Sequence, residues 1–130
     1  MDSKKEASIL NEEFVFAHER LDVFWVSLEM IRLARRVSDQ VPRGFRYFAD
    51  QLLRSAGSVP GNVSEGANRR ALGLKRQRFQ DALSECGELA GWSTTLKSMR
   101  LVCAKDADDL RLLAGRVSAM LNGLLRRLEG

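Results

Sequence analysis

The chain has 130 residues, of which 45% are hydrophobic and 29% charged, with only two prolines. A chain of this length and composition folds as a globular protein, which excludes intrinsic disorder. No apolar run approaches the roughly 20 residues of a membrane span, and charges stand where a signal peptide needs an apolar stretch. We therefore expect a cytoplasmic protein that makes no contact with a membrane.

The chemistry of the chain points away from catalysis. Cys86 and Cys103 form neither a Cys-x-x-Cys pair nor a cluster with histidine, so we expect two reduced core residues and no metal site. The one histidine, His18, is the only imidazole base for a thiol, and no Glu-x-x-His motif is present. We predict no catalytic residue, no cofactor and no enzymatic activity. A cryptic thiol or metal enzyme is the weakest hypothesis.

Residues 1–20 are mixed and polar, and we interpret them as an N-terminal arm before a bundle domain of residues 21–130. Phe14, Val15 and Phe16 form an aromatic cluster in the arm, which we expect to dock on the bundle or on a neighbouring subunit.

The first helix is predicted over residues 20–40. Its apolar residues recur at steps of three and four, as one helical face requires. They are Leu21, Phe24, Leu28, Ile31 and Ala34.

The same spacing continues across Pro60 without changing sides, from Phe45 to Val63. The pattern predicts a second helix that passes through the proline with a kink. The alternative is a break at Pro60 and a restart, because Asn62 and Glu65 have the spacing of a capping box. We interpret Pro60, Asn62 and Glu65 as a structural kink and not as a functional motif.

Residues 66–73 are polar and basic, which predicts a connection to a third helix. The apolar face of that helix comprises Phe79, Leu83, Cys86, Ala90, Ser93, Leu96 and Cys103. Small residues at helical steps predict a tight contact with another helix. They are Ser84, Gly87 and Gly91.

The fourth helix is predicted to start at a cap formed by Asp106. Its apolar face comprises Leu110, Leu113, Val117, Met120, Leu124 and Leu128. Four helices with short connections predict an all-α fold, an antiparallel up-down four-helix bundle with a kinked second helix.

Three segments carry a family resemblance: Leu21 to Trp25, Gln51 to Ala56, and the stretch Ser-Val-Pro-Gly-Asn-Val-Ser-Glu-Gly from Ser58 to Gly66. With Phe79 to Leu89 and Val117 to Leu121, they resemble the four-helix-bundle proteins of the 23S ribosomal RNA intervening-sequence family. The resemblance implies a bacterial protein without an established enzymatic activity. It also implies ring-shaped homo-oligomers, since relatives, including accessory proteins of diversity-generating retroelements, form pentamers that bind nucleic acid or a reverse transcriptase.

The best candidate for a functional site is a basic cluster with no acidic residue between Glu65 and Asp81, comprising Arg69, Arg70, Lys75, Arg76 and Arg78. Unpaired cationic groups bind phosphate, and the net charge of +4 permits attraction to nucleic acid. Arg32 and Arg36, four residues apart on the first helix, form a second candidate patch.

Trp25 and Trp92 lie beside the main apolar faces, where large aromatic residues commonly complete an oligomer contact. Our leading hypothesis is a homo-oligomeric bundle that binds RNA or DNA, or a nucleic-acid enzyme, through its basic surface. The alternative is a protein-protein assembly or scaffold module with no affinity for nucleic acid.

Overall fold

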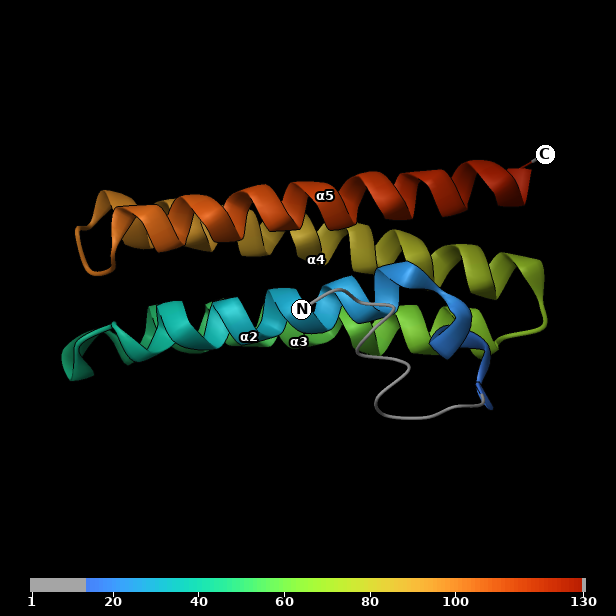
Figure 1. Ribbon diagram of the computed structural model, residues 1–130, viewed down its shortest axis with the longest axis horizontal. Helices are drawn as coiled ribbons and strands as arrows, with labels where there is room; N and C mark the ends of the chain where they lie inside the picture. Colours follow the sequence, from blue (N-terminus) through green and yellow to red (C-terminus); the bar gives the residue numbers. More distant parts are fainter. Residues whose placement is uncertain (1–13, 130) are drawn as a thin grey trace.

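The structure is a computed structural model that describes residues 14–129. Four long helices lie along one axis (Figure 1): α2 (Asp22–Asp39), α3 (Arg46–Asn68), α4 (Leu72–Ser98) and α5 (Ala104–Glu129). Two short 3-10 helices, η1 (Ala17–Arg20) and η2 (Arg43–Phe45), precede α2 and α3. The described part of the chain contains no strand, so the predicted all-α helical bundle is confirmed.

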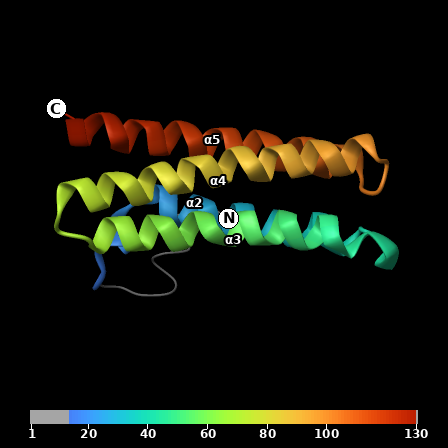
Figure 2. The same cartoon turned by 180° about the vertical axis from the view of Figure 1, so that it is seen from behind.

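The helices form two layers. Figure 1 shows α2 and α5 on one face, and Figure 2 shows α3 and α4 on the other. Contacts join the end of α4 to the start of α5, where Ser93 Oγ donates a 2.8 Å hydrogen bond to the Ala107 carbonyl and Lys97 pairs with Asp108 at 2.8 Å. The chain turns back at each connection, so helices adjacent in sequence pack antiparallel. None of the described helices is long and apolar enough to cross a membrane.

The buried face of α2 lies beside the face that the sequence pattern selected. On α2 only Ala34 of the predicted face is fully buried, and Leu21 and Ile31 are half-buried. The residues at the centre of the α2 face are Val23, Val26, Met30, Ala34 and Val37. An apolar helical face is more than 100° wide, so packing against the other helices decides which of its residues lie at the centre.

The second predicted helix is one continuous helix, α3, that includes Pro60. The alternative of a break and a restart is wrong. Proline removes one backbone N–H donor from a helix, and the turn that follows is stabilised by Asn62, whose Nδ2 donates a 2.9 Å hydrogen bond to the Ser58 carbonyl. Glu65 forms no capping box and instead pairs with Arg78. Asn62 and Glu65 thus have structural partners.

Two predicted helix boundaries are wrong. The connection expected at residues 66–73 is only three residues long, because α3 continues to Asn68 and α4 begins at Leu72. The fourth helix begins at Ala104 and is not capped by Asp106. Asp106 is buried, accepts a 2.7 Å hydrogen bond from Gln40 Nε2 and pairs with Arg36 Nε at 3.3 Å. Its carboxylate therefore ties the start of α5 to the end of α2.

The predicted tight contact at Ser84, Gly87 and Gly91 is not formed within the chain. All three residues are exposed, and a Cβ added at Gly87 or Gly91 would meet no described atom within 4 Å. The close approach lies at Gly66 on α3, where an added Cβ would stand 2.9 Å from two carbon atoms of the Phe79 ring. The absence of a side chain at Gly66 therefore lets α3 and α4 pack directly.

Replacing Gly66 by alanine should lower the free energy of unfolding by about 1–3 kcal/mol, because the new methyl group overlaps a buried ring. The matched control is Gly61→Ala in the same helix, where the position is exposed and open. That change should raise the free energy of unfolding by roughly 0.5–1 kcal/mol through helix propensity. Urea denaturation measures both, and equal effects would contradict the packing described for Gly66.

Candidate nucleic-acid interface

Three segments meet at the end of the bundle that contains the connection between α3 and α4. Asn68, the last residue of α3, bonds to η1 through the Ala17 backbone N–H at 3.2 Å. Lys75 on α4 lines one pocket, of about 260 Å³, together with Leu124 and Leu128 of α5. The start of α2, the α3–α4 connection and the C-terminal turns of α5 are thus neighbours.

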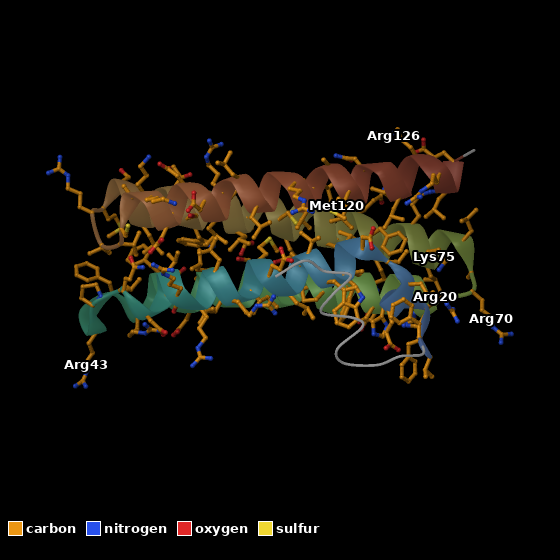
Figure 3. All side chains as sticks on the ribbon, in the orientation of Figure 1. Arg20, Arg43, Arg70, Lys75, Met120 and Arg126 are labelled. Carbon is orange, nitrogen blue, oxygen red and sulfur yellow. The ribbon has the colours of Figure 1, made fainter. Side chains whose placement is uncertain are left out.

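This meeting of segments gathers exposed arginine residues that are far apart in sequence. We call them the basic end, which comprises Arg20, Arg69, Arg70, Arg126 and Arg127. Figure 3 shows Arg20, Arg70, Lys75 and Arg126 together at this end, with Arg43 at the other. None of the guanidinium groups of the basic end forms an ion pair within residues 14–129. Their positive charge therefore remains available to an anionic ligand.

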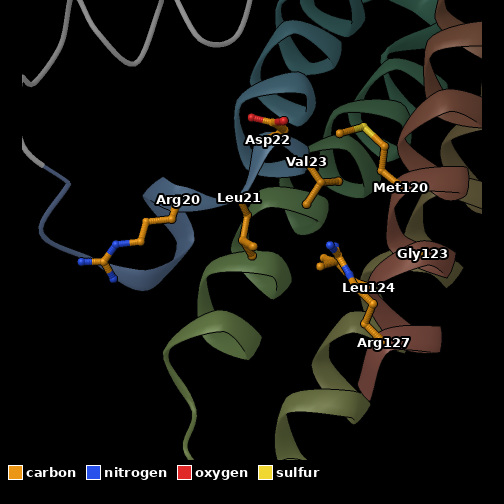
Figure 4. A pocket seen from close by; sticks show the side chains of 8 residues that line it. All are labelled: Arg20, Leu21, Asp22, Val23, Met120, Gly123, Leu124 and Arg127. Atoms are coloured by element: carbon orange, nitrogen blue, oxygen red, sulfur yellow. The ribbon is translucent and has the colours of Figure 1, made fainter. Parts of the chain in front are cut away.

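A pocket of about 380 Å³ separates α2 from α5 beside the basic end. Figure 4 shows Leu21, Val23 and Met120 around it, whereas the Arg20 guanidinium points away from the pocket. Asp22 also lines the pocket and contributes one negative charge. Arg127 of the basic end lines the pocket too, and Figure 4 shows its guanidinium group pointing into it. The pocket thus combines apolar walls with one cationic group from the basic end.

The cluster predicted from the sequence divides into residues with different roles. Arg78 pairs with Glu65 at 3.1 Å and with Asp81 at 3.3 Å, so the expectation that its charge is not neutralised is wrong. Asp81 lies one turn further along α4, and antiparallel packing brings Glu65 across from α3. Arg76 is half-buried, and its buried Nε has no hydrogen-bond partner among the described residues. Only Arg69 and Arg70 of the cluster are exposed and unpaired.

Lys75 is bound to the end of α3. Its Nζ donates hydrogen bonds to the carbonyl oxygens of Gly66, at 2.9 Å, and Ala67, at 2.8 Å. These carbonyls belong to the last turn of α3, where a cation offsets the negative end of the helix dipole. The positive charge of Lys75 therefore caps the end of α3. The sequence analysis assigned the same charge to phosphate binding.

The two arginines of the second candidate patch also differ in their surroundings. Arg36 pairs with the buried carboxylate of Asp106 at 3.3 Å, beside the start of α5. Arg32 is exposed on the same helix. A structural role accounts for Arg36, and neither residue adjoins the basic end.

The two tryptophans differ in exposure. Trp25 is only 6% exposed, and its indole N–H donates a 2.9 Å hydrogen bond to the Glu19 carbonyl. Its ring is thus covered within one chain, which leaves little surface for a partner. Trp92 is half-buried and lies edge-on to Tyr47, at 6.2 Å between ring centroids, and to Phe48, at 6.1 Å. Tyr47 is 63% exposed, so the exposed aromatic surface lies at Tyr47, beside Trp92.

The cysteines also differ, and the expectation of two core thiols is wrong for Cys103, which is exposed after the end of α4. Cys86 is buried, and burial raises the pKa of its thiol from the ordinary 9.0 to about 11. A hydrogen bond with Ser118 opposes this rise, and the charge of Glu85 adds to it. A thiol held protonated in this way is a poor nucleophile. Within the described residues no group of three His, Cys, Asp or Glu side chains is placed to hold a metal.

The sequence analysis did not identify Arg126 and Arg127, because basic residues in the last turn of a helix ordinarily complement its dipole. Arg20 was assigned to a polar arm. The signal that would identify them is their position at one end of the bundle, which depends on the direction of each helix.

The fold and its basic end define an all-helical bundle with an exposed cationic surface. Residues 19–123 match the model of the family described as 23S rRNA-intervening sequence protein. The chain belongs to this family, as the resemblance of its motifs predicted.

A solved structure supports the same fold. It is the crystal structure, at 1.70 Å resolution, of a protein with unknown function from the S23 ribosomal protein family of Bacteroides thetaiotaomicron VPI-5482. The two chains are 17% identical, with a TM-score of 0.74 over 80% of this chain and 95% of the other. No curated protein matches the chain.

Lys75→Met should lower the free energy of unfolding by about 1 kcal/mol, because it keeps the apolar stem but removes the donor to two helix-end carbonyls. Arg70→Met is the matched control, with the same change of charge at an exposed residue. It should leave stability within about 0.5 kcal/mol of the parent. The helix-capping role of Lys75 is contradicted if urea denaturation finds both variants equally stable.

A thiol reagent at pH 8 should label one cysteine per native chain and two in guanidinium, because only Cys103 is exposed. Unfolding lets the Cys86 thiol ionise near its ordinary pKa of 9.0 instead of about 11. The unfolded state therefore binds fewer protons in this range, and the free energy of unfolding should fall as pH rises from about 9. Rapid labelling of both thiols in the native protein would show that Cys86 is accessible.

Proposed function

We propose that this chain is a non-enzymatic helical bundle that binds nucleic acid through the phosphate groups. The observation that carries the proposal is the basic end, where three segments place five exposed arginines without ion-pair partners in residues 14–129. Phosphate neutralisation by arginine releases counterions and gives an affinity that depends steeply on salt. Arg69 and Arg70 are the principal contacts, and Arg20, Arg126 and Arg127 extend the surface.

Self-association would strengthen such binding. Ring-shaped homo-oligomers, which the family resemblance implies, would repeat the basic end around the assembly, and several weak phosphate contacts would then act together. The exposed ring of Tyr47 and the half-buried ring of Trp92 supply apolar surface for contact between subunits, away from the basic end.

A protein-binding scaffold is the second candidate, and the same aromatic surface favours it. Tyr47 is exposed, and Phe45 and Met99 are further exposed apolar residues near the ends of α3 and α4. Such residues are enriched in protein interfaces. In this case, binding of a protein partner would be insensitive to charge reversal at the basic end.

The test is a fluorescence-anisotropy titration of a structured RNA and a duplex DNA over a range of salt concentrations. Arg69→Glu/Arg70→Glu should weaken binding about tenfold or more at low salt and reduce the salt slope by about two. The control is Arg111→Glu/Arg116→Glu, which makes the same change of net charge at exposed residues in α5. Circular dichroism establishes that both variants remain helical.

Equal losses in the two variants would mean that only net charge matters, and the basic end would not be the site. Absence of binding at low salt would reject the proposed function and favour the protein scaffold. Light scattering of the same samples measures the subunit number, and a monomer mass at micromolar concentration would contradict self-association.

A further inference from the structure

Exposed aromatic rings lie beside the basic end, on the segment that precedes α2. Phe16 is 58% exposed and Phe14 38% exposed. The Phe16 ring stacks on the His18 ring, with 5.8 Å between centroids and 14° between planes. The Phe16 side chain therefore lies outside both buried core clusters, and its ring presents a flat aromatic surface.

This segment is held in place by hydrogen bonds and not only by its connection to α2. The Phe16 backbone N–H donates to Glu19 Oε1 at 2.7 Å, and the Ala17 N–H donates to Asn68 Oδ1 at 3.2 Å. Asn68 Nδ2 lies 2.9 Å from His18 Nδ1 and donates to the Ser64 carbonyl at 2.7 Å. Because these bonds hold the segment before a ligand binds, stacking on its ring loses less conformational entropy than stacking on a free segment would.

The Asn68 contacts also orient the imidazole ring. Oδ1 accepts from Ala17 and Nδ2 donates to Ser64, so the amide orientation is determined by its backbone partners. The amide Nδ2 faces His18 Nδ1 at 2.9 Å, so Asn68 holds the imidazole ring beside Phe16.

A hollow of about 470 Å³ lies next to these rings, lined by Phe16, His18, Ser64, Glu65 and Asn68. The hollow is shallow and open to solvent, so it can cover one side of a flat ligand. Glu65 uses Oε2 to bind Arg78, and Ser64 Oγ donates its hydrogen to the Gly61 carbonyl. The second carboxylate oxygen and the hydroxyl lone pairs remain as acceptors, which suit the amino groups at a base edge.

Positive charge flanks the hollow on two sides. Arg69 directly follows Asn68, and Arg70 follows it in the same connection. Arg20 ends η1, and its Nη2 donates to the Phe14 carbonyl at 3.3 Å. An aromatic surface beside cations that contact phosphates is the arrangement by which proteins bind single strands. A paired base in a duplex reaches such a surface only after it is flipped from its stack, which costs free energy.

We infer that the hollow beside Phe16 and His18 is a binding site for an unpaired nucleobase, and that the ligand of the basic end is single-stranded RNA or DNA. The inference rests on the proposed function, since Arg20, Arg69 and Arg70 hold the phosphates on either side of the base. The base stacks on Phe16, and its amino group donates to Glu65 or Ser64.

The test compares 20-nucleotide oligo(A) RNA, oligo(dA) and an RNA hairpin with a long stem in anisotropy titrations of the full chain at fixed moderate salt. Either single strand should bind the native protein about tenfold more tightly than the hairpin. Phe16→Ala should lose roughly tenfold in affinity for single strands, as expected for one stacked base, and keep its affinity for the hairpin. Comparison of RNA with DNA identifies the strand chemistry.

Val15→Ala is the matched control, because Val15 is 65% exposed in the same segment but has no ring. It should bind single strands like the native protein. Phe16→Trp should retain binding, and Phe16→Leu should lose most of it, since leucine keeps apolar bulk without an aromatic face. A 2-aminopurine in the oligonucleotide should be quenched by the native protein and not by Phe16→Ala.

The inference is overturned if Phe16→Ala binds single strands as tightly as Val15→Ala while Arg69→Glu/Arg70→Glu still weakens binding. That result leaves the proposed function intact. If no nucleic acid binds the native protein at low salt, both the proposed function and the nucleobase site are rejected.

Discussion

The packing of Phe79 against Gly66 determines how closely α3 and α4 approach each other beside the basic end. The ring lies where a side chain on α3 would be, so α3 and α4 approach each other closely at this point. Lys75 then reaches the last carbonyls of α3 and offsets the charge of that helix end. With the two helices held in this way, a connection of only three residues suffices between Asn68 and Leu72.

The short connection has a consequence for the segment before α2. Because α3 remains helical to Asn68, the amide of that residue stands at the end of the bundle, where it holds Ala17 and His18. The same helix end places Arg69 next to the segment with the exposed rings. One packing contact between two helices thus brings together an aromatic surface, a hollow with polar acceptors and unpaired arginine side chains.

The two ends of the bundle differ in the ion pairs that their charged side chains form. At the end near the start of α5, cations face carboxylates, as in the pairs Arg36–Asp106, Lys97–Asp108 and Lys105–Asp109. At the other end the arginines outnumber the acids, and Glu19 and Glu65 are already bound to a backbone N–H and to Arg78. The net charge of +4 therefore does not describe the basic end, where five exposed arginines have no ion-pair partner within residues 14–129.

The sequence by itself determined the helical class, the number of long helices and the continuity of α3 through Pro60, because apolar spacing is a local property of the chain. It also identified the family through the stretch that ends at Gly66. It did not locate the centre of the α2 face, since an apolar stripe has width and only packing decides which residues lie under another helix.

Only the tertiary structure decided which of the basic residues are free to bind a ligand. Lys75 and Arg78 adjoin Arg69 and Arg70 in sequence, yet their partners come from α3 and from the next turn of α4. Arg126 is 56 positions after Arg70 and lies at the same end of the bundle. Charge neutralisation depends on distances in space, which a pattern along one chain does not contain until the direction and length of each helix are known.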